Sequence, residues 1–440
     1  MRFNFTRLMH GALPLAALLL SACGGSHSYT IGGTVTGLAV STGPQSSVVL
    51  QNNGGDNLTI TQNGTFTFPT ALVNNSTTSA AYNVTVLIQP IGQTCTVTNG
   101  SGTATANVTN VLVNCSGTTA NYAYVVNAGG TISQYAIGAN GTLTEMASPV
   151  AAGTIPYSIA VAPSGLYAYV ANYGSNNVLQ YTVSSGVLTP NTTTAVAAGS
   201  NPASIAVDPS GSYVYVANAG GNSISEYSIG AGGTLTPIGT GTVSAGANPY
   251  SIAVSGSYVY VANYGSNNVS EYSIGAGGAL TPIGTGTVSA GANPYSIAVS
   301  GSYVYVANYG SNNVSQYSIG TGGALTALVP ATVAAGANPM SVAVDPSGTH
   351  AYVANYGSNN ISQYSIGTGG ALTAIVPATV LAGTNPESVT VDPSGQFVFV
   401  ANYGSNNVSQ YTISSGALTL NTVTPAVTAG TQPVFVLAAQ

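Results

Sequence analysis

The stretch Tyr-Val-Tyr-Val-Ala-Asn at residues 303–308 decides the fold, because it or a close variant occurs seven times after residue 120. Its last residue recurs every 45–47 residues, at Asn127, Asn172, Asn218, Asn263, Asn308, Asn355 and Asn402. The copies contain strand-forming residues punctuated by Gly and Asn. A period of about 45 residues built from strands is typical of a β-propeller blade. The sequence therefore predicts a propeller.

A second repeated element, Pro-x-Ser-Ile/Val-Ala-Val or a relative, precedes each copy. It begins at Pro156, Pro202, Pro249, Pro294, Pro339 and Pro386, and degenerates at Pro433. In one copy we expect strands A to D at 251–254, 258–263, 269–274 and about 280–287. Four copies carry a proline in strand D, at Pro237, Pro282, Pro330 and Pro377. Because proline is tolerated on edge strands, strand D should be outermost.

The repeats start and end in the middle of a unit. They begin with strand B at Tyr122 and finish with an unpaired strand A at 434–438, so seven complete blades can be assembled. We expect the last strand to complete the first blade and close the ring. Closure removes the open blade edges that would otherwise aggregate.

Several segments of one copy resemble known propellers. They are the 303–308 stretch, Ser318-Ile319, Gly323-Ala324-Leu325-Thr326, Asn338-Pro339 and Asp345-Pro346-Ser347-Gly348. They are similar to the bacterial seven-bladed propellers with Tyr-Val-Thr-Asn repeats and to the lactonase-type, 6-phosphogluconolactonase-like propellers. The resemblance covers about 320 of the 440 residues. In the lactonase-type relatives it implies His or Arg just after the proline that opens strand A, for chemistry on acidic lactones or sugar phosphates.

This chain departs from the lactonase pattern at that ring of positions. The ring reads Tyr157, Ala203, Tyr250, Tyr295, Met340, Glu387 and Val434. Neither His nor Arg is among them, so the lactonase residues cannot be carried over. Glu387 is the single catalytic candidate, but one carboxylate without a partner acid, base or metal ligand does not make a glycosidase-type site. We therefore assign no catalytic residue and favour a protein that is not an enzyme.

The other titratable residues of the repeats predict structural roles. His350 lies beside an A-to-B turn on the opposite face, and three aspartates form such turns: Asp208, Asp345 and Asp392. Glu226 and Glu271 replace a glutamine that other copies carry at Gln134, Gln180, Gln316, Gln363 and Gln410, so we expect solvated charge there. The sequence shows no Ser/His/Asp set, metal cluster or phosphate loop, and predicts neither metal nor cofactor.

The B-to-C loop Asn-Tyr-Gly-Ser-Asn-Asn is shared by five blades. One interpretation is a favourable turn, since Gly permits positive φ and Asn satisfies backbone groups. The other is a ligand site built from the loop tyrosines, Tyr173, Tyr264, Tyr309, Tyr356 and Tyr403. These would face the same side as Tyr157, Tyr250 and Tyr295, giving a neutral aromatic ring suited to sugars or a protein partner.

Charge excludes several classes of partner. The chain has 2 Lys+Arg and a net charge of −6, and both basic residues, Arg2 and Arg7, lie near the start. Nucleic acid is excluded as a partner because nothing neutralises phosphates. Nucleotide and most phosphoryl-transfer chemistry is excluded on the same ground.

The first residues predict export. A basic segment is followed by the apolar run 8–20, which is too short for a membrane span. Leu20-Ser21-Ala22-Cys23 resembles the lipobox of bacterial lipoproteins, which implies removal of a signal peptide at 1–22 and lipidation of Cys23. Residues 23–28 would be the tether. Gly24 after the cysteine is the pattern that permits transfer to the outer membrane.

Between tether and propeller we expect a small domain. Residues 29–115 contain about seven alternating segments, which predicts a β-sandwich similar in texture to the immunoglobulin-like modules of bacterial surface proteins. Its Cys95 and Cys115 form an even pair in an exported chain, so a disulfide is expected. A linker at 116–120 leads into the propeller at 121–440. A spacer role for the sandwich is the simplest.

The duplication pattern bears on function. Residues 243–274 and 288–319 are identical except for Glu271 against Gln316. Interchangeable blades suit a scaffold better than a site with a different role for each blade. The sequence therefore favours a lipid-anchored extracytoplasmic module that binds a neutral glycan or a protein. A divergent lactonase-family hydrolase is the alternative.

Overall fold

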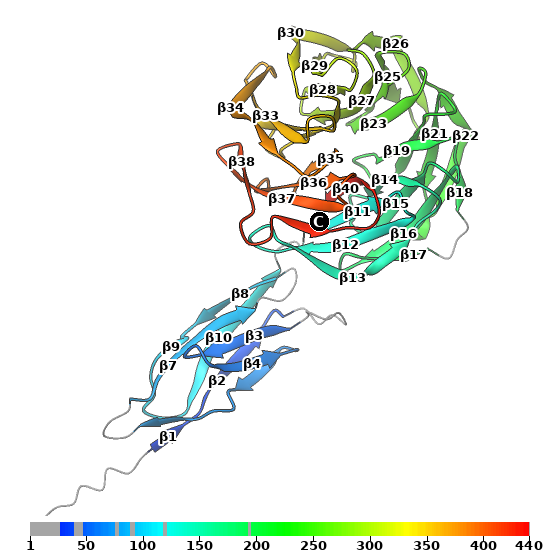
Figure 1. The fold of residues 1–440 in the computed structure, drawn as a ribbon. Helices are drawn as coiled ribbons and strands as arrows, with labels where there is room; N and C mark the ends of the chain where they lie inside the picture. The colour runs from blue at the N-terminus through cyan, green and yellow to red at the C-terminus, as the bar shows by residue number, and fades with distance from the viewer. Residues whose placement is uncertain are drawn as a thin grey trace, which may run out of the picture. The chain divides into compact units, whose positions relative to one another are not determined.

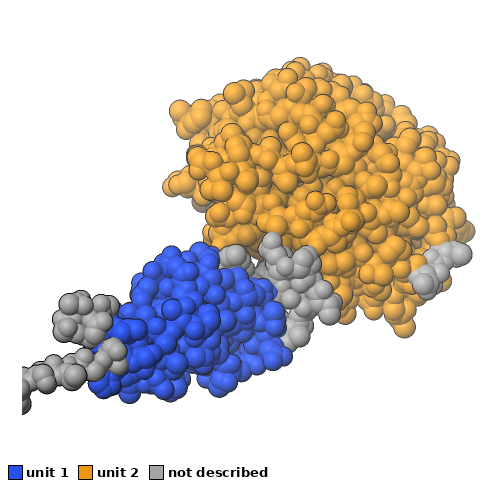
Figure 2. Space-filling view, turned by 60° about the horizontal axis from the view of Figure 1, so that its bottom comes forward, with its two compact units in different colours: residues 1–38, 47–89, 95–116 blue, residues 39–46, 90–94, 117–440 orange. Residues whose placement is uncertain are grey.

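The structure is a computed structural model that describes residues 27–38, 47–74, 79–88, 93–117, 121–191 and 195–439. It divides into two compact units, one of residues 1–38, 47–89 and 95–116 and one of the remaining residues (Figure 2). Cys23 and the expected signal peptide lie outside the described residues. In the described part of the chain, no helix has the length and apolar character needed to cross a membrane.

The first unit is a β-sandwich. Two four-stranded sheets have the orders β5-β2-β10-β8 and β4-β3-β7-β9, and β1 pairs with β6. The strands are β1 (His27–Tyr29), β2 (Ile31–Thr36), β3 (Val48–Asn52), β4 (Asp56–Ile60), β5 (Gly64–Thr67), β6 (Leu72–Asn74), β7 (Ala81–Ile88), β8 (Gln93–Thr98), β9 (Ser101–Thr103) and β10 (Val108–Gly117). Ile31 and Val113 from one sheet share a buried core with Val48 and Leu50 from the other.

The sandwich confirms the predicted fold and adds detail to it. The expected disulfide joins Cys95 on β8 to Cys115 on β10. The unit contains more strands than the alternating segments indicated. Three of them, β1, β6 and β9, have 3 residues each. Three residues are too few to show the period of two that reveals a strand in a sequence.

The second unit contains seven sheets that follow one another around a ring (Figure 1). Blade one comprises β40 (Pro433–Ala439), β11 (Tyr122–Asn127), β12 (Thr131–Ile137) and β13 (Leu143–Ala151), and blade two comprises β14 (Pro156–Val161), β15 (Tyr167–Asn172), β16 (Asn177–Ser184), β17 (Val187–Pro190) and β18 (Val196–Ala197). Blade three comprises β19 (Pro202–Val207), β20 (Tyr213–Asn218), β21 (Ser223–Ile229), the 3-10 turn η1 (Ala231–Gly233) and β22 (Leu235–Ser244). Blade four comprises β23 (Pro249–Ser255), β24 (Tyr258–Asn263), β25 (Asn268–Ile274) and β26 (Leu280–Ser289).

Blades five to seven have the same order. They comprise β27 (Pro294–Ser300), β28 (Tyr303–Asn308), β29 (Asn313–Ile319) and β30 (Leu325–Ala334); β31 (Pro339–Val344), β32 (His350–Asn355), β33 (Asn360–Ile366) and β34 (Leu372–Leu381); and β35 (Pro386–Val391), β36 (Phe397–Asn402), β37 (Asn407–Ser414), β38 (Ala417–Leu420) and β39 (Ala426–Thr428). The four prolines expected on outer strands do lie on β22, β26, β30 and β34, each at the edge of its sheet.

Strand B explains why the repeated stretch is apolar throughout. In β28, Val304, Tyr305, Val306 and Ala307 are all fully buried. Both faces of the sheet are covered, because Val304 and Val306 belong to one core cluster and Tyr305 and Ala307 to the next. A strand buried on both faces reads as a continuous apolar run instead of an alternating one.

The predicted closure of the ring is confirmed. Strand β40 pairs antiparallel with β11, so the last strand of the chain completes the first blade (Figure 1). Val434 is 4% exposed and Val436 is 1% exposed. Their burial couples the two ends of the propeller.

A side chain on strand C ties each blade to the next. Its oxygen accepts the backbone N–H of a leucine on the outer strand of the following blade, for example Leu372 to Gln316 Oε1 at 2.6 Å. All seven junctions have this bond, with Gln134, Gln180, Glu226, Glu271, Gln316, Gln363 and Gln410 as acceptors. The last of these joins blade seven to blade one.

The expectation for Glu226 and Glu271 was wrong. They are 6% and 5% exposed, and each carboxyl accepts the N–H of the next blade's leucine, at 2.6 and 2.5 Å. Burial raises the pKa of both carboxyls above the ordinary value, and the backbone hydrogen bond offsets part of that rise. The sequence period places these residues on a strand, but their burial depends on the neighbouring blade.

Deleting residues 433–440 should destabilise the propeller strongly. The deletion exposes the edge of β11 and removes the buried Val434 and Val436. Losing a few buried apolar side chains costs on the order of 5 kcal/mol, which is comparable to the stability of a whole domain. A thermal melt and light scattering measure the effect. An unchanged melting temperature would mean that the ring does not depend on this strand.

The near-identical blades provide a matched test of the strand C tie. Glu271→Gln keeps the acceptor for Leu325 N–H and removes a buried carboxyl, so the free energy of unfolding at pH 8 should rise by about 1 kcal/mol. Gln316→Glu, at the equivalent position of the next blade, should lower it by about the same amount. Urea unfolding measures both variants. If both variants were as stable as the wild type, the hydrogen bond between blades would be insensitive to the charge of its acceptor.

Candidate functional site

A cavity of about 540 Å³ opens at one end of the propeller's ring of A strands. It is lined by Ala128, Ile155, Tyr157, Tyr250, Tyr264, Tyr295, Tyr309, Met340, Tyr356, Glu387, Tyr403, Gln432 and Val434. Seven of these residues are tyrosines. The cavity therefore brings together six of the seven predicted ring residues, all except Ala203, and four of the five predicted loop tyrosines.

Each blade has a β-bulge at its ring residue, and six of the seven ring residues line the cavity. In blade four, Pro249 pairs with Asn263 and Ser251 with Ala262, so Tyr250 between them has no partner in the ladder. The same irregularity skips Tyr157, Ala203, Tyr295, Met340 and Glu387 in their blades, and Val434 in β40. Bulges redirect side chains out of the regular alternation. The residue that the bulge redirects therefore directly follows the repeated proline in each blade.

The B-to-C loops supply the second set of tyrosines. In blade four, Asn263 Nδ2 donates to Asn268 Oδ1 at 2.8 Å, and Asn267 has a φ of 56°. Tyr264 N–H donates to Asn248 O at 2.9 Å. The loop asparagines are therefore turn formers, as the first interpretation of this motif held. The tyrosine side chain is not used by the turn and lines the cavity.

Six tyrosine rings form a connected cluster, and Tyr356 and Tyr403 form a separate pair. The ring centroids of Tyr250 and Tyr295 are 5.0 Å apart at an interplanar angle of 29°, and those of Tyr250 and Tyr264 are 5.4 Å apart. Tyr173 is not among the cavity-lining residues, but its ring lies 5.7 Å from that of Tyr157. The tyrosines brace one another and present both ring faces and hydroxyls.

Glu387 is a buried carboxyl in the wall of this cavity. It is 7% exposed, and Tyr157 Oη donates to its Oε1 at 3.1 Å. The Tyr157 hydroxyl also contacts the hydroxyl of Tyr295. Burial raises the pKa of Glu387 to about 8, although the Tyr157 hydrogen bond lowers it. Most Glu387 side chains are therefore protonated at pH 7.

Three lining residues were not singled out from the sequence. They are Ala128, Ile155 and Gln432. Ile155 and Gln432 directly precede the repeated prolines Pro156 and Pro433, where other blades have Asn201, Asn248, Asn293, Asn338 and Asn385. The replacement of this asparagine is the sequence feature by which Ile155 and Gln432 could have been recognised.

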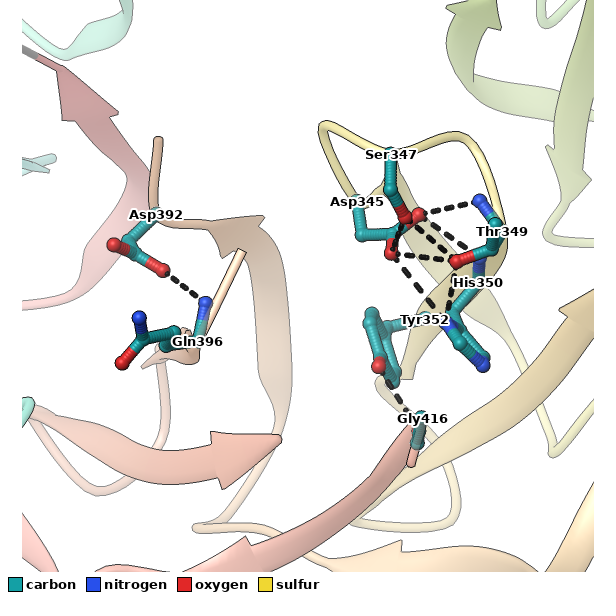
Figure 3. Close-up of polar contacts among 8 residues, drawn as sticks. All are labelled: Asp345, Ser347, Thr349, His350, Tyr352, Asp392, Gln396 and Gly416. Carbon is teal, nitrogen blue, oxygen red and sulfur yellow. Dashed lines mark hydrogen bonds and ion pairs between the residues drawn. The ribbon is translucent and has the colours of Figure 1, made fainter. Parts of the chain in front are cut away.

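His350 makes structural contacts elsewhere in the propeller (Figure 3). Its Nδ1 lies 3.4 Å from Asp345 Oδ2, and its backbone N–H donates to Asp345 Oδ1 at 2.9 Å. A Cβ on Gly416 would come within 2.1 Å of the His350 ring, so the two residues pack together. The equivalent position in another blade holds Tyr303, which packs on Gly370.

The aspartates near these turns act as predicted. Asp345 Oδ1 also accepts the N–H of Thr349 at 2.7 Å, and Asp392 Oδ1 accepts that of Gln396 at 2.9 Å (Figure 3). In the part of the chain that the structure describes, no three His, Cys, Asp or Glu residues lie close enough to hold a metal ion.

Comparison with solved structures supports the fold. A putative 6-phosphogluconolactonase from Bacteroides fragilis is 18% identical, with a TM-score of 0.62, covering 73% of this chain and 98% of that one. One from Bacteroides uniformis is 19% identical, with a TM-score of 0.64 and coverage of 73% and 99%. The periplasmic gluconolactonase of Pseudomonas aeruginosa is 20% identical, with a TM-score of 0.62 and coverage of 73% and 99%. At these identities the likeness shows the fold alone.

Sequence comparison shows the family. None of the curated proteins matches the chain. The family model described as lactonase, seven-bladed β-propeller, matches residues 91–203, 187–287, 268–342 and 326–437, which together span most of the chain and all seven blades. The chain therefore belongs to the family of seven-bladed β-propeller lactonases.

Proposed function

We propose that the propeller is a binding module that takes a hydroxyl-rich ligand without acidic groups, such as a glycan, in the tyrosine-lined cavity. The observation that carries the proposal is the convergence of seven tyrosines on a cavity of about 540 Å³. Aromatic rings stack on the apolar faces of sugars, and phenol hydroxyls exchange hydrogen bonds with sugar hydroxyls. No Lys or Arg follows Arg7 in the sequence, so an acidic ligand would find no counter-charge.

A screen of neutral glycans on three proteins tests the proposal. The variant with Tyr264, Tyr309 and Tyr356 changed to Ala should lose at least about tenfold in affinity, because each aromatic contact contributes roughly 0.5–1.5 kcal/mol. The variant with the same residues changed to Phe keeps the rings and is the matched control for stacking. Equal binding by wild type and the Ala variant, with unchanged folding, would leave the loops as turns alone.

Lactone hydrolysis is the second candidate function. The family membership and the raised pKa of Glu387 favour it, because a carboxyl with a pKa of about 8 can act as a general acid or base near neutral pH. Tyr157 would orient that carboxyl through its hydrogen bond. Opening of lactones by wild type, and its loss in Glu387→Gln with glycan binding retained, would favour this function over binding alone.

We also propose that the protein is exported and anchored in the membrane through a lipid on Cys23. The proposal rests on the sequence Leu20-Ser21-Ala22-Cys23. Several acyl chains on one residue give stable anchoring. Cys23→Ser should therefore release the protein from membranes and stop incorporation of labelled fatty acid. Unchanged membrane association would refute the anchor.

A further inference from the structure

Glu387 is a buried acid without a basic partner. Of the seven residues at the bulges, it is the one with a carboxyl. Its hydrogen bond comes from a neutral phenol, Tyr157. In the part of the chain that the structure describes there is no Lys or Arg, and the one ion pair found there, His350 with Asp345, is at an A-to-B turn. A buried carboxylate is costly unless a positive group accompanies it.

The walls around Glu387 suit a positive charge. Tyr157 donates a hydrogen bond to the carboxyl, and Tyr250 and Tyr295 lie close enough to be affected by its charge. Tyr264, Tyr309 and Tyr403 line the same cavity. The negative faces of aromatic rings attract ammonium groups within about 6 Å. Methylated ammonium groups also gain from burial of their methyl groups against rings. No positive side chain in the cavity wall would repel such a group.

The titratable groups facing Glu387 are phenols. The Tyr157 hydroxyl contacts both the Glu387 carboxyl and the Tyr295 hydroxyl. Tyr250 and Tyr356 lie close enough to be affected by the charge of Glu387. Burial raises the pKa of Tyr250 to about 12 and those of Tyr157 and Tyr295 well above the ordinary value. Met340 and Val434, the ring residues on the two A strands that flank β35, carry no charge. Between pH 6.5 and 8.5, Glu387 is therefore the ring residue that changes its charge.

We propose that the natural ligand of this cavity carries an organic ammonium group beside its hydroxyls, and that Glu387 is the counter-charge that selects it. This inference rests on the proposed binding function and names the class of ligand. The ammonium group would sit among the tyrosine rings, next to the carboxylate. Binding requires the ionised carboxyl, so it releases the proton that Glu387 carries in the empty cavity.

Choline and 3,3-dimethylbutan-1-ol are suitable probes. The two molecules have the same shape and one hydroxyl each, and choline carries a positive charge that does not change with pH. Choline affinity should rise by about 25-fold from pH 6.5 to pH 8.5, because the ionised fraction of a group with a pKa of about 8 rises by that factor. Affinity for the neutral alcohol should not rise. Isothermal titration calorimetry measures both.

Two substitutions complete the test. Glu387→Gln keeps the size of the side chain and should abolish both the preference for choline and its pH dependence. Glu145→Gln removes the same charge from the exposed face of β13, outside the cavity, and should change neither. Calorimetry in two buffers of different ionisation enthalpy should show release of a proton in wild type but not in Glu387→Gln.

The outcomes separate this inference from the proposed function. Equal affinity for choline and the alcohol, or a choline affinity that stays flat with pH, would overturn the inference. If neutral glycans still bind in that case, the binding function stands with a neutral ligand. If neither probe nor any glycan binds to folded protein, the binding function fails together with the inference.

Discussion

The propeller depends on one hydrogen bond that is repeated around the ring. A side-chain oxygen on strand C accepts a leucine N–H from the next blade at all seven junctions, including the one that joins blade seven to blade one. Gln and Glu both provide this oxygen, so Glu226 and Glu271 are buried at the position where the other five blades have a glutamine.

The site arises from the same repetition. Every blade carries a bulge next to its first proline, and in six of the seven blades the residue at the bulge lines the cavity. The scaffold fixes seven places, and the sequence of each blade decides what fills them. Glu387 lies in a tyrosine-rich wall because its blade has a carboxyl at the position where three other blades have a tyrosine and none has a basic group. The mixture of side chains in the cavity wall therefore comes from sequence differences between blades.

Most of the fold could be predicted, because period, proline positions and the unpaired last strand are properties of the chain itself. The residues of the ring could be predicted for the same reason. Burial of Glu226 could not, since it depends on the leucine of the next blade. Composition also hides two kinds of tyrosine: those like Tyr305, whose hydroxyl donates to Gly370 O in the next blade, and those like Tyr264, which line the cavity.

The central claim is that Glu387 is a neutral acid in the empty cavity, held there by burial among phenols. Carbon-13 NMR of the side-chain carboxyls measures this directly, and the chain has 8 Asp+Glu in total, so Glu387→Gln assigns the signal. We predict a titration midpoint near 8 for Glu387, and a fall of that midpoint when choline is added. A midpoint near 4.5, unchanged by choline, would contradict the account.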